Sequence, residues 1–109
     1  SSVIAVLGVH LVSYRAGNPD KFPEYLWVAR NITALREYMN MSQTTFAARV
    51  GMAQPHVSAI ERMATNISLE MLSRIAAATG VSAGRLLSEE ELTPRVLKKL
   101  VVDPPHESD

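Results

Sequence analysis

Residues 43–62, QTTFAARVGMAQPHVSAIER, predict two short helices joined by a tight turn. Ser42 precedes the first helix and suits the N-cap position, because its hydroxyl can accept a hydrogen bond from a backbone amide of the first turn. Gly51 suits the end of that helix, since glycine adopts the left-handed backbone of a helix C-terminus at little cost. The small side chains of Ala47 and Ala48 would let the two helices pack closely.

The second of these helices, expected from about Gln54 to Arg62, has apolar side chains along one edge only. Val57 and Ile60 form that edge and would hold the helix to the rest of the domain. Small or polar side chains occupy the other positions: Gln54, Pro55, His56, Ser58 and Ala59. A helix with short hydrogen-bonding groups on its outer side can enter a DNA major groove, which is about 12 Å wide.

Further helices are expected on both sides of this pair. Apolar side chains recur at spacings of three or four over residues 23–39: Tyr25, Val28, Ile32, Leu35 and Met39. Ser68 is a suitable N-cap for a helix that ends before Gly80 and carries an apolar stripe: Leu69, Leu72, Ile75 and Ala76. Ser82 opens a short fifth helix that carries Leu86 and Leu87.

A last helix has clear start signals. Thr93 occupies the N-cap and Pro94 the first helical position, while Leu92 and Leu97 are placed to form a hydrophobic staple. Its apolar side consists of Val96, Leu97, Leu100 and Val101. The periodicity therefore predicts an all-α fold of five central helices with an extra C-terminal helix.

The chain divides into three parts on this interpretation. Residues 1–22 form an apolar N-terminal segment and linker, residues 23–88 the helical domain, and residues 89–109 the C-terminal helix and tail. Within the first part, Val3–Val12 fits neither strand alternation nor helical spacing well, so strand and helix both remain open.

The composition excludes several classes of protein. The chain has 109 residues, enough for one small domain, and no cysteine, so disulfides and thiolate metal sites are excluded. Its three histidines are scattered, and no apolar run approaches the roughly 20 residues of a membrane span. The apolar run near the N-terminus has no basic segment before it, so we expect a cytoplasmic protein and not a secreted one. With no glycine-rich phosphate loop and no carboxylate–histidine grouping, we expect no enzyme, catalytic residue, metal or cofactor.

The charge distribution is nearly even. The formal net charge is zero; residues 1–62 carry six Lys or Arg against four acids, and the remainder five against seven. A neutral total still permits a positive face, but it predicts weaker non-specific DNA binding than a strongly basic domain would show.

The stretch from about Ile32 to Leu87 resembles the Cro/repressor-type (XRE-like) helix-turn-helix domain. The matching positions are Ile32, Leu35-Arg36-Glu37, Met41-Ser42-Gln43, Phe46-Ala47, Gly51-Met52, Val57-Ser58, Ile60-Glu61-Arg62, Ser68-Leu69, Ile75-Ala76 and Gly80-Val81. The resemblance implies a five-helix, lambda-repressor-like fold, double-stranded DNA as partner, homodimers and palindromic operators.

The same resemblance implies site residues. Gln54 would pair with an adenine edge through both amide atoms, and Gln43 would brace that amide and touch a phosphate. The implied base-contacting residues are Gln54, Pro55, His56 and Ala59. The implied phosphate-contacting residues are Gln43, Thr44, Ser58, Arg62, Thr65 and Asn66. Apart from the resemblance, Arg36 and Glu37 are expected to serve structure, as an exposed or partly buried ion pair that links helices.

Two departures from the family pattern affect the loop after the recognition helix. The family usually has Gly where this chain has Met63, and often Pro where it has Ile67. Because a left-handed backbone is costly for Met, we expect the loop that carries Thr65 and Asn66 to follow another path.

The apolar ends of the chain, Val3–Val12 and Val96–Val102, hold more apolar surface than five helices require. We expect them to form a dimer interface, with packing onto the same domain as the alternative. The leading functional hypothesis is a sequence-specific transcriptional regulator, most simply a repressor. The alternative is an antitoxin or other partner-binding protein of the same fold, which would hold a toxin and regulate its own promoter.

Overall fold

The computed structural model describes residues 22–101, in which six helices and no strand are found. The helices are α3 (Glu24–Tyr38), α4 (Gln43–Val50), α5 (Gln54–Glu61), α6 (Leu69–Thr79), α7 (Ala83–Leu86) and α8 (Pro94–Leu100). The predicted all-α fold of five helices followed by a C-terminal helix is confirmed. The segment Val3–Val12 and the tail after Val101 lie outside the described residues.

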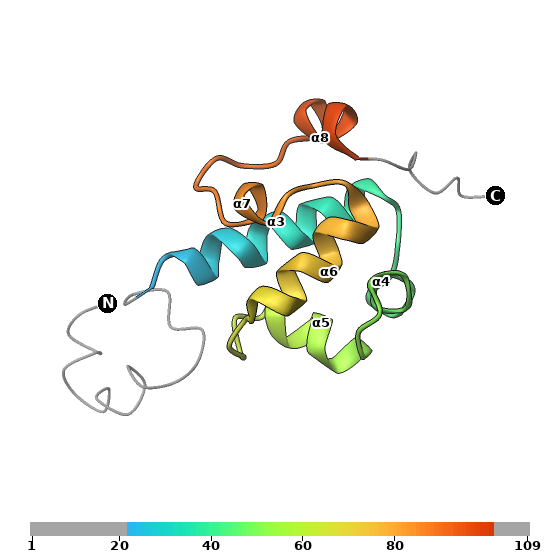
Figure 1. The fold of residues 1–109 in the computed structure, drawn as a ribbon, viewed down its shortest axis with the longest axis vertical. Coiled ribbons are helices and arrows are strands. Elements are labelled where there is room, and N and C mark those ends of the chain that lie inside the picture. The colour runs from blue at the N-terminus through green and yellow to red at the C-terminus, as the bar shows by residue number, and fades with distance from the viewer. Residues whose placement is uncertain (1–21, 102–109) are drawn as a thin grey trace.

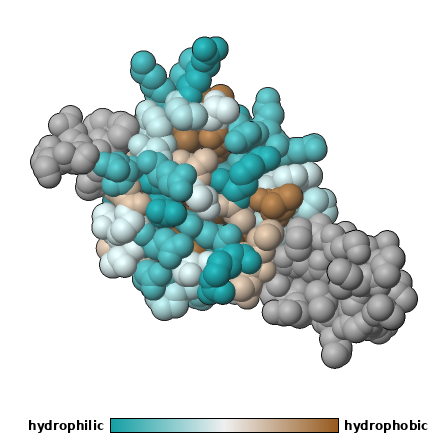
Figure 2. Space-filling view, turned by 180° about the vertical axis from the view of Figure 1, so that it is seen from behind, coloured by the Kyte–Doolittle hydropathy of each residue, from teal (hydrophilic) through white to brown (hydrophobic). Residues whose placement is uncertain are grey.

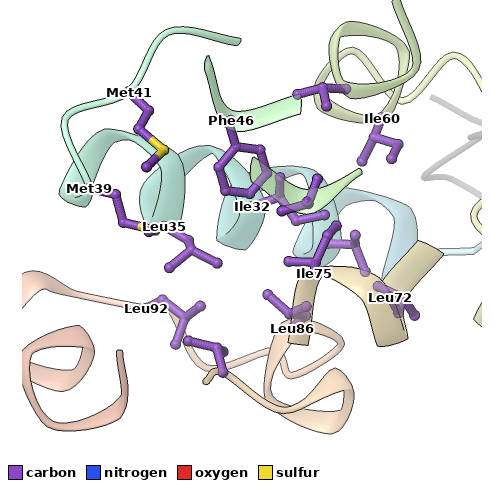
Figure 3. Packing of buried hydrophobic residues seen from close by; sticks show 14 of the residues in the cluster. Ile32, Leu35, Met39, Met41, Phe46, Ile60, Leu72, Ile75, Leu86 and Leu92 are labelled. Carbon is purple, nitrogen blue, oxygen red and sulfur yellow. The ribbon is translucent and has the colours of Figure 1, made fainter. Parts of the chain in front are cut away.

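The helices are arranged around α3. It spans the length of the folded part (Figure 1). Helices α5, α7 and α8 pack directly on α3, while α4 packs on α5 and α6, and α6 packs on α7. Their common core includes Phe46, which is completely buried and lies beside Ile32 of α3 (Figure 3). Among the described residues, no helix is long and apolar enough to cross a membrane.

Local signals in the sequence explain where the helices begin and end. Each predicted N-cap hydroxyl accepts a hydrogen bond from a backbone amide three residues on, at Ser42, Ser68, Ser82 and Thr93. Gly51 and Gly80 end their helices in the left-handed conformation, with φ of 75° and 86°. These capping predictions are confirmed.

The C-terminal helix belongs to the same core. Leu97 of α8 is fully buried and Leu92 nearly so, in one cluster with residues of α3 and α7. Val96, Leu100 and Val101 are partly buried against that cluster. The C-terminal apolar stretch therefore packs back onto its own domain, which was the alternative to its forming a dimer interface.

One expected core residue is exposed. Leu69 was placed on the inward stripe of α6, but it is 76% exposed. The buried face of α6 consists of Leu72, Ile75 and Thr79, and Leu69 lies roughly a quarter turn from the middle of that face. Thr79 can be buried because its hydroxyl donates to the carbonyl of Ile75 at 2.7 Å and accepts from the amide of Val81.

A buried amide that the sequence reading missed joins α3 to the end of α7. Asn31 is fully buried, and its Nδ2 donates to the carbonyls of Leu86 and Ser88, each at 3.0 Å. Beside it, Arg30 Nη2 donates to the carbonyl of Glu89 at 2.8 Å. These bonds satisfy carbonyl groups that the short helix α7 leaves free at its C-terminal end.

Candidate nucleic-acid interface

Helix α5 is held by one edge, as its sequence predicts. Val57 and Ile60 are each 1% exposed and pack in the core, whereas Pro55 and His56 are exposed. Ala59 is half-buried at the margin of the same outward surface. The helix therefore presents its first turn to solvent while its apolar edge fixes its orientation.

The turn before α5 is fixed from both sides. The amide of Met52 donates to the carbonyl of Ala47 at 2.8 Å, which closes the end of α4. The carbonyl of Gly51 accepts a hydrogen bond from Arg74 Nη1 of α6, also at 2.8 Å. Ala47 is 2% exposed, and its small side chain permits the close packing of α4 against α5.

A chain of side-chain hydrogen bonds links the exposed edge of α5 to the interior. Nε2 of Gln54 donates to Oε1 of Gln43 at 3.0 Å, and Nε2 of Gln43 donates to Oε1 of Glu61 at 3.0 Å. Arg36 completes the chain, because its Nε and Nη2 donate to the two oxygens of Glu61 at 2.7 and 3.1 Å. Nη1 of Arg36 also donates to the carbonyl of Met41. We call these four side chains, Arg36, Glu61, Gln43 and Gln54, the polar relay.

The two charged members of the polar relay are largely buried. The Arg36 side chain is 15% exposed and that of Glu61 8%. The hydrogen bond to Glu61 is the main reason that the pKa of Arg36 is raised; burial opposes this, and the charges of Glu61 and Glu37 add to it. The guanidinium stays charged and compensates the carboxylate.

The ion-pair partner of Arg36 differs from the predicted one. Arg36 does form a partly buried ion pair that links two helices, as predicted, but the carboxylate belongs to Glu61 of α5 and not to Glu37. Adjacent residues of a helix point in different directions and do not face each other, so Glu37 lies exposed instead. Glu61 was not singled out as a site residue. The available signal was its position four residues after inward-facing Val57, on the same face of α5, where a carboxylate is expected to be paired.

The direction of the hydrogen bonds fixes how both amides are turned. Arg36 can only donate and the Glu61 carboxylate can only accept, so the amide nitrogen of Gln43 must face Glu61. Its oxygen then faces Gln54, whose amide nitrogen donates inward. This leaves Gln54 with its Oε1 and one N–H for a partner outside the protein.

The helix-turn-helix family matches residues 32–86, from the middle of α3 to the end of α7. The chain belongs to the Cro/repressor-type helix-turn-helix family. A hypothetical transcription factor of Neisseria meningitidis serogroup B is 34% identical over 85 residues, which are 78% of this chain and 76% of that protein. The crystal structure of a hypothetical transcription factor from Neisseria has 35% identity and a TM-score of 0.56, and covers 71% of this chain and 84% of that one.

Family membership makes the departures at the end of α5 informative. Met63, where relatives of the helix-turn-helix family usually have Gly, adopts φ of 58° in the left-handed region. We expected the cost of this conformation for Met to send the loop along another path. Met63 instead adopts the left-handed backbone that Gly would have. The amide of Ala64 donates to the carbonyl of Ala59 at 2.7 Å and closes the helix end in spite of the side chain.

The residues that the helix-turn-helix resemblance assigns to phosphates come from α4, from α5 and from the loop after α5. Arg62 Nε donates to Ser58 Oγ at 3.2 Å, so these two side chains contact each other on the outer part of α5. Thr44 is exposed in the first turn of α4. Thr65 Oγ1 donates to the carbonyl of Asn66, and Asn66 Oδ1 accepts from the Tyr25 hydroxyl at 2.6 Å. The loop is thereby tied to α3.

Proposed function

We propose that this protein binds double-stranded DNA sequence-specifically and regulates transcription, with α5 lying in the major groove. The observation that carries the proposal is the polar relay, which orients the Gln54 amide on the exposed edge of a helix whose apolar side chains Val57 and Ile60 are buried in the core. The family and the names of the Neisseria relatives support the same function.

Gln54 is the residue that we assign to direct base reading. Its free Oε1 can accept from the N6 amino group of adenine, and its remaining N–H can donate to N7 of the same base. Because Gln43 already holds the other N–H, the amide meets the base in the required direction without being reoriented. A bidentate pair of this kind gives about 1–3 kcal/mol of discrimination against a wrong base.

The other assigned contacts surround this pair. Pro55, His56 and Ala59 face the bases in our proposal, because Pro55 and His56 are exposed and Ala59 borders the same surface. The proposed phosphate contacts come from α4, α5 and the following loop: Gln43, Thr44, Ser58, Arg62, Thr65 and Asn66. To contact a phosphate, Arg62 would give up its hydrogen bond to Ser58. The loss of this bond costs little free energy because the bond is exposed.

We further propose a homodimeric repressor that reads a palindromic operator. A two-fold axis places two α5 helices in successive major grooves about 34 Å apart, which a monomer cannot do. Repression follows if the operator overlaps a promoter. Co-purification of a small toxin would instead favour the antitoxin alternative, in which the same DNA-binding edge regulates the protein's own promoter.

Selection of bound sequences from a random DNA duplex pool tests this proposal. We expect an enriched palindrome with half-site centres about ten base pairs apart, because this spacing places both half-sites on one face of the duplex. Enrichment of a single unrepeated site would contradict the dimer, and the absence of any enriched sequence would contradict the whole proposal.

Replacement of Gln54 tests the assignment of the base-reading residue. We expect Gln54→Ala to weaken operator binding by about 1–3 kcal/mol and to remove the preference at one base pair of each half-site. Arg62→Ala is the matched control, since loss of a phosphate contact should weaken binding to all sequences alike and lower the salt slope by about one. Unchanged affinity and preference in Gln54→Ala would show that α5 is not the recognition helix.

A further inference from the structure

Leu69 is the most exposed large apolar side chain of the described part of the chain. It begins α6 and is 76% exposed, more than Phe22 or Leu26, the other large apolar side chains of the described part that are exposed. A single exposed leucine is ordinary on a protein surface. Leu69, however, begins the helix whose Leu72 lines an apolar hollow that no described residue fills.

That space is a hollow between the first turns of α3 and α6 and the end of α7. Its apolar walls come from Tyr25, Val28, Ile67, Leu72 and Leu87, and its volume is about 130 Å³. Figure 1 shows the first turns of α3 and α6 at the same end of the molecule. Among the lining residues only Glu24 is charged. An apolar space of this kind holds water poorly and is suited to an aliphatic side chain.

We propose that a second copy of this chain covers this surface, with Leu69 of each copy seated in the hollow of the other. Leu72 lines the hollow and lies three residues after Leu69 on α6, so the protruding side chain and the hollow are neighbours. A contact around a two-fold axis brings the same surface of both copies together and fills both hollows at once.

The charges of this surface permit contact between identical copies. The two charged residues of α6 are Glu70 and Arg74, and they form an ion pair at 2.8 Å. The formal net charge of the chain is zero, so the copies do not repel each other as a whole. Figure 2 shows the molecule from the side opposite to that of Figure 1. This face is mostly hydrophilic, with apolar surface confined to small areas.

This interface rests on the proposed function and would complete it. A palindromic operator requires a two-fold dimer in which both recognition helices stay free. Neither Leu69 nor the walls of the hollow include any of the ten residues that we assign to DNA; a hydrogen bond from the Tyr25 hydroxyl of the wall to Asn66 links the two sets. The dimer formed this way leaves the exposed edge of α5 available in both copies.

The test is sedimentation equilibrium of the full chain and of Leu69→Glu. We expect the dimer Kd of Leu69→Glu to rise by about 100-fold, because two identical contacts are lost and burial of each leucine accounts for about tenfold. Leu26→Glu is the matched control, since Leu26 is 48% exposed and lines a different groove, with Ala29 and Met63. Its dimer Kd should stay within about threefold of the unaltered chain. Circular dichroism with thermal melting checks that both variants are folded.

Three outcomes would overturn the proposal. The first is an unaltered chain that stays monomeric at high micromolar concentration, and the second is a Leu69→Glu dimer as tight as the original. The third is a Leu69→Glu variant that loses thermal stability as a monomer while its association is unchanged, which would show that Leu69 is covered by its own chain.

Binding to a single operator half-site separates this inference from the proposed function. If both hold, Leu69→Glu keeps its affinity for a half-site and loses the advantage of the full palindrome. A chain that dimerises through Leu69 but selects no DNA sequence would leave the interface standing and refute the DNA proposal. A chain that selects a DNA sequence, but whose dimer Kd is unchanged by Leu69→Glu, would refute the interface and leave the DNA proposal standing.

Discussion

Glu61 accepts hydrogen bonds from side chains of two other helices, Arg36 of α3 and Gln43 of α4. The three helices meet at this carboxylate, which is 8% exposed. A buried charge of this kind stabilises a fold only while it is paired and hydrogen-bonded. Glu61 therefore links the stability of the domain to the direction of the Gln54 amide.

Replacement of Glu61 should be costly because it isolates a buried cation. We expect Glu61→Ala to lower the free energy of unfolding by about 3 kcal/mol, measured by urea denaturation, since Arg36 would lose its charge partner. The double variant Arg36→Met with Glu61→Leu should regain most of that loss while its operator affinity stays low, because Gln43 is no longer braced. Equal destabilisation of the single and double variants would contradict this account.

At the scale of an element, the turn between α4 and α5 depends on one backbone conformation. Gly51 has φ of 75°, and a Cβ built at that position would meet Arg74 Nη1 only at an ordinary distance of 3.5 Å. Space is therefore available for a side chain, and the requirement for glycine comes from the backbone angle.

A pair of glycine substitutions separates the effect of the backbone angle from the effect of the space available for a side chain. Gly51→Ala should lower the free energy of unfolding by about 1–2 kcal/mol, because the left-handed backbone is unfavourable for alanine. Gly84→Ala should be neutral or stabilise by up to about 1 kcal/mol, since Gly84 lies in helix α7 and a Cβ there meets nothing within 4 Å. The reverse order of stability in thermal or urea unfolding would refute this explanation.

For the whole molecule, the C-terminal helix is part of the domain that carries the exposed edge of α5. Leu97 of α8 is completely buried, and α8 packs on α3, which also supplies Arg36 to the polar relay. Loss of α8 packing should therefore weaken the support of α3 and the elements that depend on it.

Truncation of Leu97 tests this dependence. We expect Leu97→Ala to lower the free energy of unfolding by about 2–5 kcal/mol, the range for deleting a buried leucine side chain. Leu26→Ala should cost clearly less, because Leu26 is 48% exposed. Native-state hydrogen exchange should show a single cooperative loss of protection in Leu97→Ala, from α3 to α8; loss confined to α8 would contradict the shared core.

The sequence by itself determined the helices, their caps and the outward edge of α5. These depend on neighbours within about four residues, such as the hydroxyl of Ser42 or the spacing of Val57 and Ile60. For the same reason the pattern misplaced Leu69, since position on a helix margin depends on what packs against it.

Only the tertiary structure decided the partner of Arg36, the burial of Asn31 and the packing of α8 against α3. Each of these joins residues from helices far apart in the chain, such as Arg36 and Glu61 across α3 and α5. Several carbonyls and carboxylates could have met these donors, and a linear pattern carries no distance between them. The choice was made by the core, which positions α3 and α5 so that one carboxylate lies within reach of both the arginine and the glutamine.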